Sequence, residues 1–170
     1  GGEIRSVTAG GPGFVAVGVV GSQAAVWTSS DGFSWTQIPH DEAIFGGPGN
    51  QWIDDVTTGG PGLVAVGGDE PVDNAIRAAV WISEEGASWT RVADDPAVFG
   101  GPTDERSMRT VIAWDRGLVA VGDGVWTSDD GAGWIRIADS LDFETARDLA
   151  PGGRGVVSGG PGLVAVGSDQ

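Results

Sequence analysis

The residues of this chain that could carry chemistry are mainly carboxylates and arginines. The 170-residue sequence contains 24 Asp and Glu, nine Arg, no Lys, one His, and neither Cys nor Tyr. Because thiolates are absent and His40 stands alone among turn-forming residues, we expect no zinc site. The acidic segment DDGAGW (129–134) lacks the alternating oxygen ligands and the closing glutamate of a calcium loop. The sequence therefore predicts neither a metal nor a cofactor.

Two adjacent acids differ from the others because they fall on a predicted strand. Asp54 and Asp55 lie in the segment QWIDDVT (51–57), whereas most other acids lie in turns, as is typical of a solvated surface. A glycosidase needs two carboxylates that face each other across a cleft. We therefore predict no catalytic residue and no enzyme activity. A glycan-processing hydrolase, completed by missing or partner sequence, is the alternative.

Three arginines share one position of a repeat. Arg5, Arg109 and Arg154 each lie eight residues before a repeated glycine, and Asp54 takes this position in the second unit. Arginine is a forked donor that suits carboxylate and phosphate groups, so this level is a candidate site for an anionic ligand. The alternative is that the arginines pair with Asp54, Asp55 and neighbouring acids, and the level then offers no anion site.

The tryptophans occupy repeated and unrepeated positions. Repeated aromatics predict packing, and this set contains Trp27, Trp81, Trp126, Trp35, Trp89 and Trp134. Trp52 and Trp114 have no counterpart in other units, and an unrepeated aromatic near a turn is a candidate for stacking on a sugar or a partner. The candidate ligand-binding residues are therefore Arg5, Arg109, Arg154, Asp54, Trp52 and Trp114.

A nine-residue sequence reveals the organisation of the chain. GGPGLVAVG occurs at 59–67 and at 159–167, with related copies at 10–18 and 114–122. The copies follow one another at intervals of about 50 residues, a period typical of propeller repeats. A second strand that lies between two neighbouring blades is buried on both faces, which explains its continuous aliphatic run.

Each unit resolves into four short strands rich in Val, Ile, Thr and Trp, with turn residues at every boundary. The sequence therefore predicts an all-β fold, a β-propeller built of four-stranded antiparallel blades, with about three and a half blades in this chain. We expect a single piece over 1–170, with blades at approximately 1–40, 50–93 and 106–138 and a partial blade at 145–170.

The segments SSDGFSW, SEEGASW and SDDGAGW, at the same place in three units, resemble the Asp-box (BNR) repeat of sialidase-like propellers. The resemblance implies structural turns. Asp31 and Asp130 can accept backbone N–H bonds across their turn, and the tryptophan packs over the hairpin. The residues concerned are Ser29, Asp31, Gly32, Trp35, Ser83, Glu85, Gly86, Trp89, Ser128, Asp130, Gly131 and Trp134. Sialidase activity is excluded because such enzymes use a tyrosine nucleophile, and this chain has no tyrosine.

The units also resemble repeats of secreted actinobacterial proteins, which implies an extracellular or cell-surface location in a bacterium. The net charge of −15 argues against nucleic acid and anionic membranes as partners. We expect a non-catalytic binding or interaction propeller for a glycan or an anionic ligand, with a purely structural repeat of a surface assembly as a further alternative. Because unit four supplies only two strands, we also expect either a fragment of a longer propeller or a homo-oligomer, most simply a dimer that closes the ring.

Overall fold

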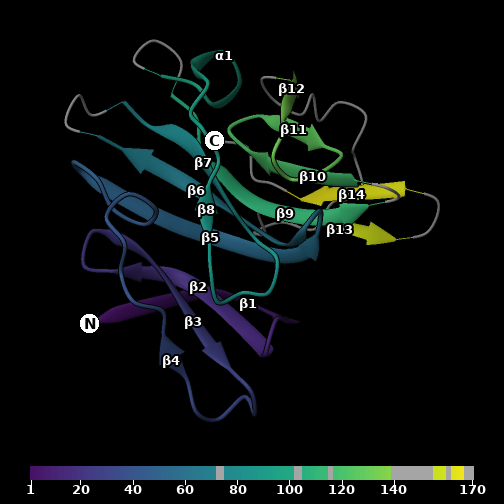
Figure 1. Ribbon diagram of the computed structural model, residues 1–170. Helices are drawn as coiled ribbons and strands as arrows, with labels where there is room; N and C mark the ends of the chain where they lie inside the picture. The colour runs from purple at the N-terminus through teal and green to yellow at the C-terminus, as the bar shows by residue number, and fades with distance from the viewer. Residues whose placement is uncertain (72–74, 102–104, 115–116, 139–154, 160–161, 167–170) are drawn as a thin grey trace.

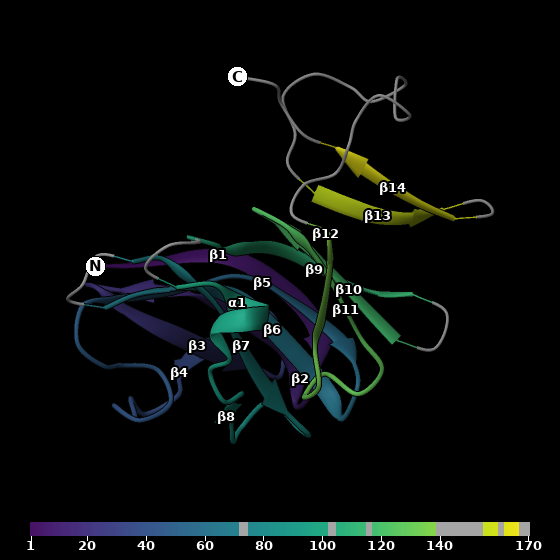
Figure 2. The same ribbon diagram turned by 90° about the horizontal axis from the view of Figure 1, so that it is seen from above.

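The computed structural model describes residues 1–71, 75–101, 105–114, 117–138, 155–159 and 162–166 (Figures 1 and 2). The first sheet contains β1 (Gly2–Gly10), β2 (Gly13–Val20), β3 (Gln23–Ser29) and β4 (Thr36–Gln37). The second sheet contains β5 (Asn50–Gly59), β6 (Gly62–Glu70), β7 (Arg77–Ser83) and β8 (Thr90–Arg91). The third sheet contains β9 (Met108–Trp114), β10 (Gly117–Gly122), β11 (Val125–Ser128) and β12 (Ile135–Ala138).

In each of these sheets the strands pair antiparallel and in chain order. The predicted all-β fold and its four-stranded antiparallel units are therefore confirmed for the described residues. Two further strands, β13 (Gly155–Gly159) and β14 (Gly162–Val166), form a hairpin. The strand β13 lies against β9, the first strand of the third sheet.

The first strands of the three sheets lie next to one another. β5 contacts β1 on one side and β9 on the other, and Figure 1 shows the three sheets side by side around these strands. The term inner strands is used below for β1, β5 and β9. The sheets therefore meet along their first strands, where residues far apart in the sequence become neighbours.

The strand β6 is buried on both faces, as the continuous aliphatic run predicts. Leu63 and Ala65 belong to the apolar core between the first and second sheets. Val64 and Val66 belong to the core between the second and third sheets. Because successive side chains of a strand point to opposite faces, one strand of aliphatic residues serves both cores.

Each inner strand contains a β-bulge at the same position of the repeat. The pairing with the second strand skips Arg5 in the first sheet, Asp54 in the second and Arg109 in the third. A bulge adds one residue to a strand and redirects its side chain. The predicted charged level is thus a row of bulge residues, called the bulge row below.

The last glycine of the nine-residue repeat lies opposite this bulge. In each sheet a Cβ on that glycine would clash with a backbone carbonyl oxygen in the inner strand or, for Gly122, of the residue directly before that strand; the glycines are Gly18, Gly67 and Gly122. Their φ angles lie outside the left-handed region, so the reason for glycine is close approach of the backbones. The repeated glycine is therefore a packing requirement of the bulge.

The first turn of one sheet also packs against the outer turn of the next. Gly11 and Gly60 have left-handed φ angles of 57° and 55°. A Cβ on Gly11 would clash with the carbonyl oxygen of Glu85 in the second sheet, and one on Gly60 with that of Asp130 in the third. The same glycine thus serves a turn and a contact between sheets.

The two segments that connect the sheets make equivalent contacts. In AIFGGP (43–48) the Ile44 carbonyl accepts a hydrogen bond from Trp81 Nε1 at 2.6 Å. In AVFGGP (97–102) the Val98 carbonyl accepts one from Trp126 Nε1 at 2.7 Å. The second segment contains a single helical turn, α1 (Pro96–Phe99), which the sequence analysis did not predict because four residues show no helical period.

We predict that Gly67→Ala destabilises the protein by about 1–3 kcal/mol, because the new methyl group overpacks the bulge. Gly133→Ala is the matched control, since its Cβ would meet only Asp130 Oδ1 at 3.6 Å. Equilibrium unfolding in denaturant measures both changes. Equal stability of the two variants would contradict the packing role of the repeated glycine.

Candidate functional site: the bulge row of the inner strands

The structure brings three of the predicted ligand-binding residues into direct contact. Arg5 Nη1 lies 2.7 Å from Asp54 Oδ1, and Trp52 Nε1 donates to Asp54 Oδ2 at 3.0 Å. Arg5 Nε also donates to Glu3 Oε1 at 3.2 Å. Asp54 therefore receives one donor from its own strand and one from the neighbouring sheet.

Arg109, the bulge residue of the third sheet, also has an acidic partner. Its Nη2 lies 3.3 Å from Asp123 Oδ1. The other oxygen of Asp123 accepts the Ser107 hydroxyl at 2.7 Å and the Ser107 backbone N–H at 3.0 Å. Both described arginines of the row are thus paired with carboxylates, the arrangement expected if the row holds no free anion. Arg154 lies outside the described residues.

Electrostatics link the residues of the bulge row. Burial raises the pKa of Asp54 above its ordinary value, while Arg5, Trp52 and the more distant charge of Arg109 act in the opposite direction. Both arginines remain accessible, with side chains 31% and 41% exposed for Arg5 and Arg109. The row is therefore a partly hydrated surface that presents donors and acceptors together.

Asp55, the neighbour of the bulge residue Asp54, joins all three inner strands. Its Oδ1 accepts the Ser6 hydroxyl of β1 at 2.6 Å and the Val56 N–H at 2.9 Å. Its Oδ2 accepts the Thr110 hydroxyl and the Val111 N–H of β9, both at 2.9 Å. Each carboxylate oxygen thus accepts two hydrogen bonds, and the side chain spans the sheets.

Sequence reasoning noted Asp55 on an inner strand but missed this role. The available signal was that Ser6, Asp55 and Thr110 share one repeat position, seven residues before the repeated glycine, and all are polar. Asp123 and Ser107 were also missed, because neither belongs to a repeated motif. The two hydroxyls and Asp55 are best described as a polar connection between sheets.

The two unrepeated tryptophans have different environments. Trp52 is half-buried, is hydrogen-bonded to Asp54, and lies so close to Gly68 that a Cβ there would clash with its ring. Trp114, at the end of β9, is 44% exposed. Trp114 is therefore the more accessible of the two for stacking, although it lies at the opposite end of its strand from Arg109.

The three outer turns share a set of Ser, Gly and Trp hydrogen bonds. In the second sheet Ser83 Oγ accepts the Gly86 N–H at 2.7 Å, and Trp89 Nε1 donates to the Gly86 carbonyl at 2.9 Å. The equivalent pairs in the other sheets are Ser29 with Gly32, Trp35 with Gly32, Ser128 with Gly131 and Trp134 with Gly131. These bonds hold the tryptophan over its own turn.

The acidic residue of the turn accepts backbone hydrogen bonds in the first and third sheets, where it is aspartate. Asp31 Oδ1 accepts the N–H groups of Phe33 and Ser34, both at 2.8 Å. Asp130 Oδ1 accepts those of Ala132 and Gly133 at 2.9 and 2.7 Å, so the predicted acceptor role is confirmed for both aspartates.

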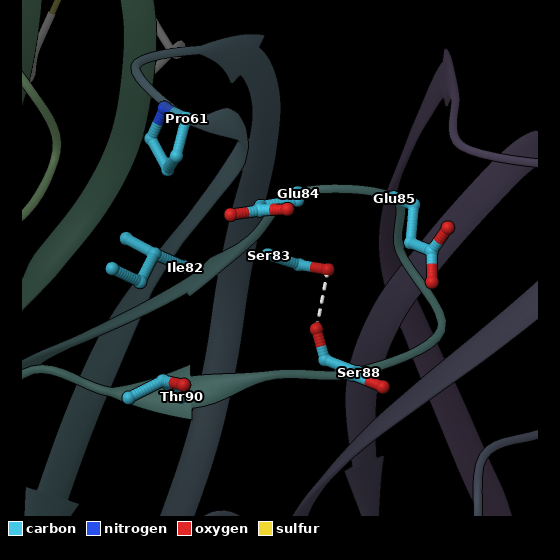
Figure 3. Close-up of a pocket in the computed structure, with 7 residues that line it drawn as sticks. All are labelled: Pro61, Ile82, Ser83, Glu84, Glu85, Ser88 and Thr90. Atoms are coloured by element: carbon cyan, nitrogen blue, oxygen red, sulfur yellow. Dashed lines mark hydrogen bonds between the residues drawn. The ribbon is translucent and has the colours of Figure 1, made fainter.

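The second turn is built differently and borders a shallow pocket. Ser83 Oγ donates to the Ser88 carbonyl at 2.5 Å. Figure 3 shows this bond, with the side chains of Glu84 and Glu85 pointing away from each other. Pro61, Ile82 and Thr90 complete the lining. The turn therefore forms without an aspartate, through hydrogen bonds of Ser83, Gly86 and Trp89 and the Ser88 carbonyl.

Across the described ranges, no group of three or more His, Cys, Asp or Glu could hold a metal ion. None of the helices in these ranges has the length and hydropathy needed to span a bilayer. No family model and no curated protein matches this sequence.

We predict that Asp31 and Asp130 titrate below the ordinary aspartate value of 3.8, because backbone N–H bonds stabilise the charged carboxylate and lower the pKa of each. A folded-state pKa below the unfolded one stabilises the fold above the unfolded pKa, and this contribution is lost as pH falls through the folded pKa. Carboxyl NMR titration measures both midpoints. Midpoints at or above 3.8 would contradict the acceptor role of these side chains.

Proposed function

We propose that the three four-stranded sheets are consecutive blades of a β-propeller and that their outer turns are Asp-box turns. Two features support this. The first strand of each sheet lies next to that of the following sheet, as strands that converge on a propeller axis do. The same residues also make the same contacts at both sheet–sheet interfaces, including the linker carbonyl bonded by Trp81 and Trp126.

We propose further that the chain is a non-catalytic interaction module. The supporting observation is that the carboxylates of the inner strands serve as hydrogen-bond acceptors within the fold. Asp55 accepts four hydrogen bonds. Asp54 pairs with Arg5 and Trp52, and Asp123 pairs with Ser107 and Arg109. Acids held in this way serve structure rather than proton transfer.

The bulge row is the proposed binding surface, and a carbohydrate is the proposed ligand class. The row combines two accessible arginines with Glu3, Asp54 and Asp123, so its charges nearly balance and an anion gains little from it. A polyhydroxyl ligand uses donors and acceptors side by side, which this surface offers. The proposed setting is extracellular, on a bacterial cell surface, where glycans are abundant.

Screening on a glycan array tests this function, with Arg109→Ala as the informative variant. Arg109 is half exposed and has a weak contact with Asp123, so the fold should tolerate its removal while binding falls at least about tenfold. Arg136→Ala, in the outer strand of the same sheet, is the matched control and should bind as the wild type does. Binding that is unchanged in Arg109→Ala, or absent from the wild type, would contradict the proposed surface.

A further inference from the structure

One face of the first sheet carries the apolar residues that the other two sheets bury. This face, called the seam face below, is the side of the first sheet that points away from the second sheet. It contains Ile4, Val7, Phe14 and Trp27. The equivalent faces of the second and third sheets belong to the cores formed with the preceding sheet.

The seam-face positions hold apolar residues in all three sheets, but the exposed fraction of the side chain differs between the sheets. Ile4 is 52% exposed, whereas Ile53 and Met108 at the same repeat position are both 0% exposed. Burial of a large apolar side chain stabilises a protein. The apolar residue at this position of all three sheets therefore indicates that the first sheet is also meant to be covered here.

Two further positions follow the same pattern. Val7 is 56% exposed, whereas its counterparts Val56 and Val111 are 5% and 2% exposed. Phe14 is 38% exposed, against 1% for Leu63 and 2% for Leu118. Exposed aliphatic and aromatic residues gathered on one face mark an interaction surface.

The buried interfaces show what covers such a face. Val15 of β2 reaches Gly86 in the outer turn of the second sheet, and Val64 of β6 reaches Gly131 in that of the third. The turn glycines Gly86 and Gly131 are buried accordingly, whereas their counterpart Gly32 in the first sheet is exposed. Among the described residues, a second strand with the aliphatic sequence of the repeat covers the equivalent faces of the other two sheets but not the seam face.

The indole of Trp27 lacks the partner that its counterparts have. Trp81 and Trp126 each donate to a carbonyl of the segment that precedes their sheet. Within the part of the chain that the structure describes, the Trp27 indole N–H has no hydrogen-bond partner, and its side chain is half-buried. Among these described residues, the seam face therefore combines an indole donor without an acceptor and exposed apolar side chains.

We propose that the seam face docks a second copy of this chain through its hairpin β13–β14. The residues 159–167 repeat 59–67 letter for letter, and the earlier copy supplies Val64, which covers the third sheet. The hairpin of a second copy therefore has the sequence that already forms this interface once. The contact joins two different surfaces, so it generates a ring or a linear chain of copies.

Sedimentation velocity over a concentration series tests the proposal, and it is independent of ligand binding at the bulge row. The wild type should associate as its concentration rises. Ile4→Asp should remain a monomer over the same range, because the contact would bury an unpaired charge. Ile135→Asp is the matched control and should associate like the wild type, because its repeat position is exposed even in the second sheet, as Thr90 shows.

A mixing experiment distinguishes this contact from a symmetric one. Val164→Asp, at the place of Val64 in the identical sequence, should also remain a monomer. An equal mixture of Ile4→Asp and Val164→Asp should form dimers, since one variant keeps an intact hairpin and the other an intact seam face. Circular dichroism verifies that both fold, and Val7→Glu replaces Ile4→Asp if that variant does not. A wild type that is monomeric throughout, a mixture that does not associate, or loss of association in Ile135→Asp would overturn the proposal.

Discussion

The carboxylate of Asp55 is the interaction on which the arrangement of the sheets depends. Where the three inner strands converge, the Val111 N–H and the hydroxyls of Ser6 and Thr110 bond to an acceptor in a neighbouring sheet, and buried donors without acceptors are costly. Asp55 satisfies Ser6, Val56, Thr110 and Val111 from one side chain. The apolar cores can then close on both sides of the second sheet without leaving these donors unpaired.

Close approach of the backbones is the second constraint, and it explains the repeated sequence. The aliphatic residues of β6 serve two cores at once, and Gly67 leaves room for the bulge of β5. The interface between the first and second sheets resembles that between the second and third, so both require the same types of residue. The bulge in turn directs Arg5, Asp54 and Arg109 to one surface, so the candidate binding site is a consequence of sheet packing.

The strands and their grouping into four-stranded sheets were predictable because each unit repeats the same environment. The bulges were not predicted, although one extra residue shifts the alternation: Ile53 and Val56 lie in the same core three residues apart, not two or four. The polar repeat position of Asp55 was visible in the sequence, but its role was not, because its partners lie on strands distant in sequence. The alternative of paired arginines, left open by the sequence, describes Arg5 and Arg109. The shared position was visible in the sequence, whereas the partners depended on tertiary contacts.

Asp55, and not its neighbour Asp54, holds the three inner strands together. The most direct test compares the free energy of unfolding of Asp55→Ala with that of Asp54→Ala. We expect a loss of at least about 2 kcal/mol for Asp55→Ala, because four donors lose a charged acceptor. For Asp54→Ala we expect a loss of less than about 1 kcal/mol, as for a partly exposed ion pair. Equal losses, or a larger loss for Asp54→Ala, would contradict this role of Asp55.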